Sequence, residues 1–293
     1  MEAQTAQNYS MLSSKNFIRA GNQLLPGAAS GLRYEDVTPP PVHRRPAPRR
    51  QHIKKYSVGI ACIRFINDKP HVIMICKRYS YAFGEFVYGK YPQYPGGKYV
   101  KKQLIELFSN MTVEEKIDIL YMDFDRLWHK IWLTRHKGSS VYHTARDKFE
   151  AICVNDGAQL RKLINKSNNS HLVWEIPKGR KKSRSEPEVN CAIREFEEET
   201  NIAKNMYRLI PGARMTFSHH DKGVEYVNTY FVAIMSRTYE PKVSFNTQIQ
   251  LHEVSDIRWV PLEHVEYLDQ TNMLAGFVKN AFAIAKKYHK GQT

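Results

Sequence analysis

The sequence predicts an α+β fold in which a helical domain interrupts a sheet. Two runs of mostly β-branched and other apolar residues, 58–63 and 71–76, are typical of neighbouring strands in a buried sheet, and turn residues at 67–70 join them. Five segments with helical periodicity follow, and strand patterns return only near His171. We therefore expect a strand-rich domain that contains an inserted all-helical domain.

The inserted segment contains five stretches in which apolar residues recur at helical spacing. They span 101–108, 112–120, 124–132, 144–152 and 158–164. Thr112, followed three residues later by Glu115, forms a capping-box pattern, and Asp123 is suited to cap the helix after it. These signals indicate separate helices rather than one long one.

Strand patterns resume after the insertion, and a helix closes the chain. The expected strands are 171–177, 214–217, 226–235 and 257–260, and the closing amphipathic helix is 275–288. The predicted division is a tail (1–52), the first strands of the strand-rich domain (53–78), the helical insertion (79–168) and the rest of the strand-rich domain (169–293).

Residues 1–52 form the predicted tail. The segment 38–50 is rich in proline and arginine, and such a composition cannot build a hydrophobic core. We therefore expect a disordered, basic N-terminal tail. An arm that grips RNA and a solvated linker explain it equally well.

Composition indicates a soluble globular protein with a polyanionic partner. Of the 293 residues, 42% are hydrophobic and 25% are charged, and the formal net charge is +15. The chain has no run of about 18 apolar residues and no signal-peptide pattern, which argues against membrane-spanning and secreted proteins. The four cysteines lack metal-ligand spacing and fit reduced thiols in the cytoplasm.

The stretch from Gly179 to Ile202 carries the strongest chemical signal. It concentrates six carboxylates in a basic chain: Glu186, Glu188, Glu195, Glu197, Glu198 and Glu199. The apolar stripe of the expected helix consists of Val189, Ala192, Ile193 and Phe196. Glu195, Glu198 and Glu199 share a different face. Carboxylates crowded in this way repel one another unless a cation joins them, and oxygen ligands suit a hard ion such as Mg²⁺ or Mn²⁺.

The spacing of these residues closely resembles the Nudix box, G-x5-E-x7-R-E-U-x-E-E-x-G-U, where U is apolar. Residues 194–199 have the form R-E-U-x-E-E, and Glu186 lies eight residues before Arg194. Two positions depart from the family pattern. The interval from Gly179 to Glu186 is one residue longer, and Asn201 replaces the last glycine. Asparagine tolerates the left-handed conformation that ends a helix, so a loop–helix–loop is still expected.

Segments outside the box extend the resemblance to one branch of the family. Residues 174–179 and 191–195 look like the mRNA-decapping branch. Residues 77–86, 110–112 and 123–128 closely resemble the decapping enzymes of large DNA viruses. Among these, the enzyme of African swine fever virus is the nearer and the poxvirus enzymes are more remote. The resemblance covers about residues 55–290 and leaves out the tail.

The resemblance implies a fold, a reaction and a partner. Members of this branch have a mixed sheet between helices, with a helical domain inserted after the first strands. They hydrolyse the pyrophosphate linkage of the mRNA cap with Mg²⁺ or Mn²⁺, releasing 7-methyl-GDP and an RNA with a 5′-monophosphate. The expected partner is capped mRNA, with its RNA body on the helical domain and the basic surface. The expected location is the cytoplasm, which for a viral protein is the host cytoplasm.

The resemblance also implies roles for the box residues. Glu195 and Glu199 are the expected metal ligands. Glu198 is expected to be the catalytic carboxylate or a further ligand, since families differ on this point. Glu186 would pair with Arg194 as a structural support, or act as an outer ligand. The extra residue before Glu186 leaves its role more open than the others.

Three residues outside the helix complete the predicted site. A later acid usually finishes such sites, and Glu253 is the first candidate as ligand or base. Asp221 is the second candidate for a metal ligand, although it could be only a turn residue. Lys178, directly before the box, is expected to contact phosphate.

Aromatic and basic residues are the candidates for substrate binding. The cap base carries a delocalised positive charge and is usually held between aromatic faces. The candidate rings are Tyr81, Phe83, Phe86, Tyr226 and Tyr230. Arg126 and Lys130 are candidates for an RNA-binding face of the helical domain, whereas Trp128 and Trp132 fit its core better.

Two other functions share these features. A Nudix hydrolase of small substrates, such as dinucleoside polyphosphates or diphosphoinositol polyphosphates, would have the same box, but it would need neither the net charge nor the basic insertion. A catalytically weak RNA-binding protein could use the fold as a platform, but clustered glutamates would repel RNA unless metals bind them. The sequence therefore favours the decapping hydrolase.

Overall fold

The structure is a computed structural model that describes residues 53–92, 100–132, 138–221, 223–244, 247–268 and 273–291. The side chains at positions 221, 248, 249 and 273 are not part of this description. The predicted tail lies outside the described residues. Everything below concerns the compact unit of residues 51–293.

Two long strands form the centre of the sheet. β1 (Ile53–Ile66) and β2 (Lys69–Lys77) pair antiparallel around a tight turn at Asn67 and Asp68, both of which have positive φ. Asparagine and aspartate tolerate this left-handed conformation better than other side chains do, so the turn expected at 67–70 closes a hairpin. Both strands extend beyond the predicted runs.

Five further strands complete one mixed sheet. They are β3 (Trp174–Glu175), β4 (Lys178–Gly179), β5 (Tyr207–Asp221), β6 (Val224–Met235) and β7 (Val254–Pro261). The main order is β3-β2-β1-β6-β5, with β4 paired to β1 and β7 paired to β2. The pairing of β1 with β6 is parallel and the other pairings are antiparallel. Of the strand predicted at 171–177, only 174–175 forms a strand, and β4 follows directly after the predicted range.

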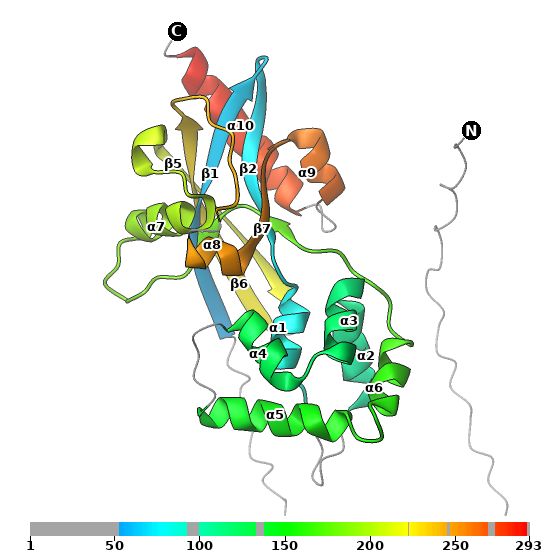
Figure 1. Cartoon of the computed structure of the whole chain (residues 1–293). Helices are drawn as coiled ribbons and strands as arrows, with labels where there is room; N and C mark the ends of the chain where they lie inside the picture. Colours follow the sequence, from blue (N-terminus) through cyan, green and yellow to red (C-terminus); the bar gives the residue numbers. More distant parts are fainter. Residues whose placement is uncertain are drawn as a thin grey trace, which may run out of the picture. The chain divides into compact units, whose positions relative to one another are not determined.

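Helices cover both faces of the sheet (Figure 1). α7 (Glu188–Thr200) packs through Cys191, Ala192 and Phe196 on the face that carries Ile60 and Ile73. α10 (Met273–Lys290) packs on the other face, and α9 (Leu262–Leu268) lies next to it. The alternation of side chains along β1 explains both cores, because successive residues point to opposite faces. The predicted mixed sheet between helices is confirmed.

Among the described residues, six helices lie between β2 and β3. They are α1 (Tyr81–Val87), α2 (Lys101–Ser109), α3 (Val113–Tyr121), α4 (Phe124–Ile131), α5 (Ser140–Ile152) and α6 (Ala158–Ile164). They enclose a core of their own, which includes Phe83, Phe86 and Trp128. The capping box of Thr112 and Glu115 and the cap at Asp123 are present as predicted. α1 was not predicted, and neither was α8 (Gln248–Glu253).

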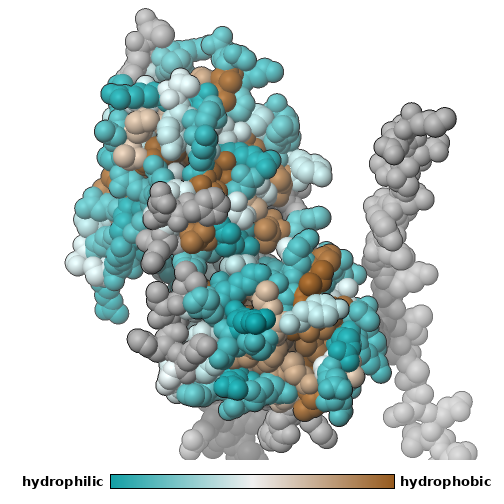
Figure 2. Space-filling view, in the orientation of Figure 1, coloured by the Kyte–Doolittle hydropathy of each residue, from teal (hydrophilic) through white to brown (hydrophobic). Residues whose placement is uncertain are grey.

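The surface shown in Figure 2 is mainly hydrophilic, with apolar patches over the helical unit. Exposed apolar residues of that unit include Val113, Ile117 and Tyr121, which recur every four residues along α3. Within the described part of the chain, none of the helices has the length and hydropathy needed to cross a membrane.

Candidate active site

α7 presents the glutamates of the box next to the sheet. The helix follows Pro187, which occupies the N-cap position, and its apolar stripe is seated in the core beneath it. It ends at Asn201, which has φ 55° and ψ 23° and so adopts the predicted left-handed conformation. The residue that replaces the family's glycine therefore ends the helix in the way a glycine would.

Arg194 holds three of the box carboxylates together. Its guanidinium donates to Glu186 through Nε at 2.9 Å, and through one terminal nitrogen to Glu195 at 2.7 Å and Glu198 at 3.1 Å. The other terminal nitrogen donates to the Arg180 carbonyl and to Glu186. We call Arg194 with Glu186, Glu195 and Glu198 the Arg194 cluster. The predicted pairing of Glu186 with Arg194 is present despite the extra residue in the loop.

Gly179 allows the Glu195 carboxylate to lie against the loop backbone. A Cβ atom built on Gly179 would overlap the carboxylate group of Glu195. Any side chain at this position would therefore displace a predicted metal ligand. The first glycine of the box is required here for close approach, because it leaves the space that the carboxylate fills.

A second cation, Lys77, joins carboxylates from three other elements. Its ammonium lies 2.8 Å from Glu199 of α7, 3.2 Å from Glu175 of β3 and 3.6 Å from Glu253 at the end of α8. The backbone N–H of Lys178 donates to the other Glu199 oxygen at 2.9 Å. We call Lys77 with Glu175, Glu199 and Glu253 the Lys77 cluster. It contains the most buried carboxylate of the two clusters, since the Glu199 side chain is only 2% exposed, whereas Glu253 lies at its edge.

Burial and neighbouring charges shift the pKa values of these carboxyls in opposite directions. Burial raises the pKa of Glu199 to about 7, although Lys77 acts against it, and burial also raises the pKa of Glu195. Burial would raise the pKa of Glu175 as well, but the ammonium groups of Lys178 and Lys77 outweigh it and the pKa falls. Hydrogen bonds from Arg194 lower the pKa of Glu186. At Glu195 and Glu199, burial therefore penalises the ionised carboxylate by more than the neighbouring cations offset.

The donor chemistry of these residues fits a hard divalent cation. Glu195 and Glu199 are one helical turn apart, are both partly or fully desolvated, and both have raised pKa values. An added cation would stabilise their ionised forms. Among the described residues, no three His, Cys, Asp or Glu side chains already converge on one metal position. Arg194 and Lys77 instead occupy the carboxylate oxygens, so metal binding would have to displace some of these ion pairs.

The two later acids lie in different places. Glu253 reaches Lys77 and is 53% exposed, so the structure brings it to the edge of the Lys77 cluster. Asp221 ends β5 and pairs with Val224 of β6, which in turn pairs with Ile53 of β1. Gly179, which contacts Glu195, pairs with Val58, five residues further along β1. Five residues along β1 correspond to about 17 Å. The backbone of Asp221 is therefore not brought to the carboxylates.

Lys178 lies in the site but is already engaged. Its ammonium pairs with Glu175, on the same carboxylate oxygen that accepts a hydrogen bond from the Tyr81 hydroxyl. Glu175 raises the pKa of Lys178 despite its burial, so the group is charged. A phosphate contact would require Lys178 to exchange Glu175 for the substrate.

Three of the five predicted base-binding rings are in hydrophobic cores, and those predictions are wrong. Phe83 and Phe86 are 0% and 2% exposed and pack within the helical core. Tyr230 is 1% exposed and stacks on Phe217 beside Phe277. Burying these large rings stabilises the fold, and no ligand could reach their faces without opening a core.

The other two candidate rings differ in exposure. Tyr81 is 61% exposed, with its hydroxyl on Glu175 at 3.2 Å. Tyr226 is partly buried, stacks on His219 with 5.1 Å between ring centroids, and has the Lys55 ammonium 5.3 Å from its ring. Tyr81 is thus the exposed ring of the set, and it adjoins the Lys77 cluster.

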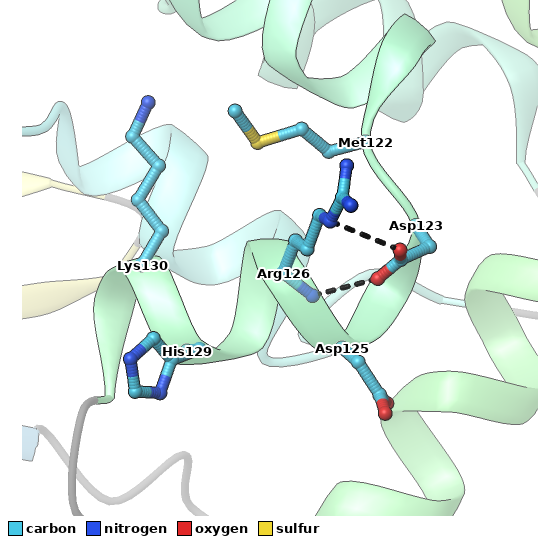
Figure 3. Close-up of a pocket in the computed structure, with 6 residues that line it drawn as sticks. All are labelled: Met122, Asp123, Asp125, Arg126, His129 and Lys130. Carbon is cyan, nitrogen blue, oxygen red and sulfur yellow. Dashed lines mark hydrogen bonds and ion pairs between the residues drawn. The ribbon is translucent and has the colours of Figure 1, made fainter.

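Arg126 and Lys130 line a pocket on α4. The pocket has a volume of about 570 Å³ and is also lined by Met122, Asp123, Asp125 and His129 (Figure 3). Arg126 turns back toward Asp123, with 3.5 Å between Nε and the carboxylate, and its side chain is 75% exposed. Lys130 pairs with Asp118. The predicted Trp128 core is confirmed, since that ring is 2% exposed.

The sequence analysis assigned no role to Lys77 or Glu175. Glu175 stands four residues before Gly179, at the end of an expected strand, and Lys77 ends the run 71–76. A charged residue that terminates a buried strand is a weak signal for a site at that edge of a sheet. Only the pairing of β2 with β3 and the packing of α7 reveal that these residues meet.

Comparison with known proteins identifies the family. Residues 146–280 match the NUDIX domain family. The chain is 34% identical over 244 residues to the mRNA-decapping protein g5R of African swine fever virus, covering 80% of this chain and 97% of the viral protein. The chain belongs to the Nudix family. The family assignment confirms the predicted fold class and the interpretation of the Gly179–Ile202 stretch as a Nudix box.

Two further comparisons concern more distant proteins. A protein of Acanthamoeba polyphaga mimivirus, named as a candidate mRNA-decapping protein, is 29% identical over 224 residues, covering 64% of this chain and 57% of the viral protein. The crystal structure of a C. elegans Ap4A hydrolase in a binary complex has a TM-score of 0.42 at 14% identity, covering 79% of this chain and 98% of that chain.

Proposed function

We propose that this Nudix protein is a metal-dependent mRNA-decapping hydrolase that releases 7-methyl-GDP and leaves an RNA with a 5′-monophosphate. The observation that carries the proposal is the extent of its similarity to the viral g5R protein. The similarity covers nearly all of that protein, and so it includes the helical unit as well as the box. A long, basic chain with a helical insertion suits a polyanion such as RNA better than a small nucleotide.

The carboxylates of α7 and its neighbours would hold the cation of this reaction. Glu195 and Glu199 are the proposed ligands, with Glu186 as an outer ligand. Nudix hydrolases generally need a divalent metal, and Mg²⁺ or Mn²⁺ fits the all-oxygen donor set here. When bound, such an ion offsets the charge of the pyrophosphate and lowers the pKa of a water molecule.

The remaining side chains would handle the proton and the phosphates. Glu198 is 22% exposed and held between Arg194 and Lys182, so its carboxylate is fixed but open to solvent, as a general base requires. Glu253 is the second candidate for this role, because it is exposed at the edge of the Lys77 cluster. Lys178 would leave Glu175 to bind a phosphate oxygen, and its charge would stabilise the transition state.

The partner in this proposal is capped mRNA in the host cytoplasm. The helical unit would bind the RNA body, and Arg126 is the better exposed of the two candidates, because its side chain is 75% exposed and its ion pair with Asp123 is long, at 3.5 Å. Lys130 would contribute less, since it is 31% exposed and already paired with Asp118. Contacts of this kind fix orientation and affinity without reading sequence.

The test uses RNA with a radiolabelled 7-methylguanosine cap, incubated with the protein and Mg²⁺ or Mn²⁺, with products separated by thin-layer chromatography. We expect labelled 7-methyl-GDP, and we expect Glu198→Gln to reduce its release by about 10²–10⁴-fold while RNA affinity persists. Glu197→Gln is the matched control. Glu197 is next to Glu198 but accepts a hydrogen bond from the Lys204 backbone, outside both clusters.

Two results would redirect the proposal. If neither metal supports release from capped RNA while small polyphosphates are cleaved readily, the protein is a small-substrate Nudix hydrolase. If the protein binds RNA tightly and cleaves neither, the fold serves as a binding platform. Equal losses in Glu198→Gln and Glu197→Gln would remove Glu198 from its proposed role.

A further inference from the structure

The loop between β4 and α7 is exposed and strongly basic. Four of the five residues 180–184 are cations, and the fifth is Ser183. Of these four cations, Lys182 is the one that forms an ion pair with a carboxylate in the described part of the chain, with Glu198 at 3.1 Å. The Ser183 hydroxyl lies 2.9 Å from that of Ser185, a second exposed serine. The loop thus presents hydroxyl groups among cations, next to the glutamates of the box.

The residues before Ser183 form a charge pattern that one class of protein kinases recognises. These kinases have acidic substrate-binding sites, and they select serines that follow arginine or lysine at three and two residues' distance. In the whole sequence, three serines and no threonine have a cation at both positions: Ser57, Ser80 and Ser183. The pattern alone therefore offers three candidates.

The fold leaves one of these three serines accessible. Ser57 lies within β1, where its hydroxyl donates to Asn228 at 2.5 Å and its backbone is paired with β6. Ser80 is 5% exposed, and its hydroxyl donates to the buried carboxylate of Glu115. Ser183 is exposed and belongs to neither a helix nor a strand. Enzymes that modify a chain act on exposed loop segments, so the structure selects Ser183.

We propose that Ser183 is a phosphorylation site for a serine kinase that prefers basic segments, and that its phosphate weakens RNA binding beside the active site. The Ser183 oxygen attacks the γ-phosphorus of ATP, and the new O–P bond forms as the bond from that phosphorus to the β–γ bridging oxygen breaks. ADP leaves with the electron pair, and the hydroxyl proton goes to a base of the kinase. The site itself is independent of the proposed function, whereas its effect rests on RNA as the substrate.

A phosphate on Ser183 would change the electrostatics next to Glu198. Phosphoserine carries a charge of about −1.5 to −2 and accepts strong hydrogen bonds from cations. Lys182, its neighbour in the chain, pairs with Glu198 through a side chain that is 65% exposed, and such a pair exchanges partners at little cost. The phosphate would therefore compete for the Lys182 ammonium. It would also offset about half of the loop's positive charge, so that a polyanion would be attracted less strongly.

The first experiment maps phosphate on the folded, full-length protein. The protein is incubated with ATP and the catalytic subunit of cAMP-dependent protein kinase, and mass spectrometry identifies the modified residues. We expect near-stoichiometric phosphate on Ser183 and none on Ser57 or Ser80. Arg180→Gln should slow the modification about ten-fold, whereas Arg184→Gln, which removes a cation from the other side of the serine, should change it little. Absence of phosphate on Ser183, or equal losses in the two variants, would overturn the assignment.

The second experiment measures binding of uncapped single-stranded RNA, which requires no hydrolysis. We expect the phosphorylated protein to bind about ten-fold more weakly than the unmodified protein at low salt, and the difference to shrink as salt is added. Ser183→Ala, treated with the kinase in the same way, should bind as the untreated wild type does. Unchanged affinity in the phosphorylated protein, or an equal loss in Ser183→Ala, would overturn the proposed effect. Absence of decapping with this binding pattern intact would reject the proposed function alone.

Discussion

The Arg194 cluster and the Lys77 cluster are built on the same plan from different parts of the chain. In each, one cation contacts three glutamates. The Arg194 cluster lies within nine consecutive residues of one motif and its loop, Glu186 to Arg194, plus the next turn of α7. The Lys77 cluster joins β2, β3, α7 and α8, with 122 positions between Lys77 and Glu199. The Arg194 cluster is therefore formed by residues close together in the sequence, and the Lys77 cluster by residues that only the tertiary structure brings together.

The two clusters also differ in burial. The Arg194 carboxylates keep 15–22% of their side-chain exposure, whereas Glu199 keeps 2% and Glu175 keeps 11%. Water screens the first set and hardly reaches Glu199 and Glu175, although Glu253, at the edge of the Lys77 cluster, is 53% exposed. The local cluster can therefore exchange its partners at little cost, while the tertiary cluster helps to fix how α7 sits on the sheet. α7 contributes Glu195 to one cluster and Glu199 to the other, so a cation bound between them would couple the two.

The largest expected effect comes from removing the cation of the Lys77 cluster. Lys77→Met removes the ammonium partner of Glu199 and one of the two ammonium partners of Glu175, which keeps Lys178, and breaking a buried pair from one side costs about 3–5 kcal/mol. We expect the free energy of unfolding, measured with denaturant on the metal-free protein, to fall by that amount. Arg194→Met should cost less, about 1–2 kcal/mol, because its partners remain partly hydrated.

Salt and a double variant sharpen this comparison. The effect of Arg194→Met should shrink with added salt, whereas the effect of Lys77→Met should not. Adding Glu199→Gln to Lys77→Met should restore part of the stability, because it removes the unpaired charge. Equal losses in the two single variants, with the same salt dependence, would show that burial does not distinguish the clusters.

The same contrast explains what the sequence could predict. The Arg194 cluster follows from residue spacing on a helix, and Glu186 still reaches Arg194 because a loop absorbs the extra residue. The Lys77 cluster depends on strand order and register, which no local pattern encodes. Glu253 was proposed for the site because family members usually have a later acid, and the structure places it 3.6 Å from the Lys77 ammonium.

The prediction of helices from the sequence was limited in the same way. Five of the helices in the insertion were predicted because their apolar residues recur at helical spacing. α1 was not, because Tyr81–Val87 contains a glycine and four aromatic or β-branched residues, which are poor helix formers. Its stability comes from the Ser80 cap, from Glu115 on another helix and from burial of Phe83 and Phe86. The exposed Tyr81 ring was therefore placed by tertiary contacts that the sequence does not reveal.

A change of pH is expected to have an intermediate effect on stability, through the ionisation of Glu199. An acid whose pKa is raised in the folded state opposes folding when it ionises. The cost is absent below about pH 4.5, grows toward pH 7, where the folded-state pKa lies, and is complete above it. In the metal-free protein, Glu199→Gln should therefore gain stability relative to the wild type between pH 5 and pH 8, by up to about 3 kcal/mol.

Thermal unfolding across this pH range is the measurement. Glu197→Gln, on the same helix but outside both clusters, should show no such trend. The lowered pKa of Glu175 acts in the opposite sense, but it removes stability only as pH falls below about 4.5, outside this window. A flat difference between Glu199→Gln and the wild type would mean that Lys77 already compensates the buried carboxylate in full.

The smallest expected effect concerns Asn201, which ties α7 to the segment that carries Glu253. The Asn201 side chain accepts a hydrogen bond from Thr247 at 3.1 Å and donates to Gln250, whose amide in turn donates to the Glu199 carbonyl at 3.0 Å. Asn201→Gly keeps the left-handed backbone and loses these contacts, so we expect a loss of about 0.5–1 kcal/mol. Asn201→Ala should lose about 1 kcal/mol more, because alanine is strained at this φ.

Hydrogen exchange on α8 distinguishes two roles for Asn201, which are ending α7 through its backbone conformation and linking α7 to α8 through its side chain. If Asn201 serves as the tie, Asn201→Gly should speed amide exchange at Leu251, whose N–H bonds to Thr247, without changing exchange in the middle of α7. Glycine at this position would then restore the family's box while loosening the edge of the Lys77 cluster. Unchanged exchange with unchanged stability would mean that asparagine is simply tolerated at a left-handed helix end, and that its side-chain contacts do not hold the segment of Glu253 in place.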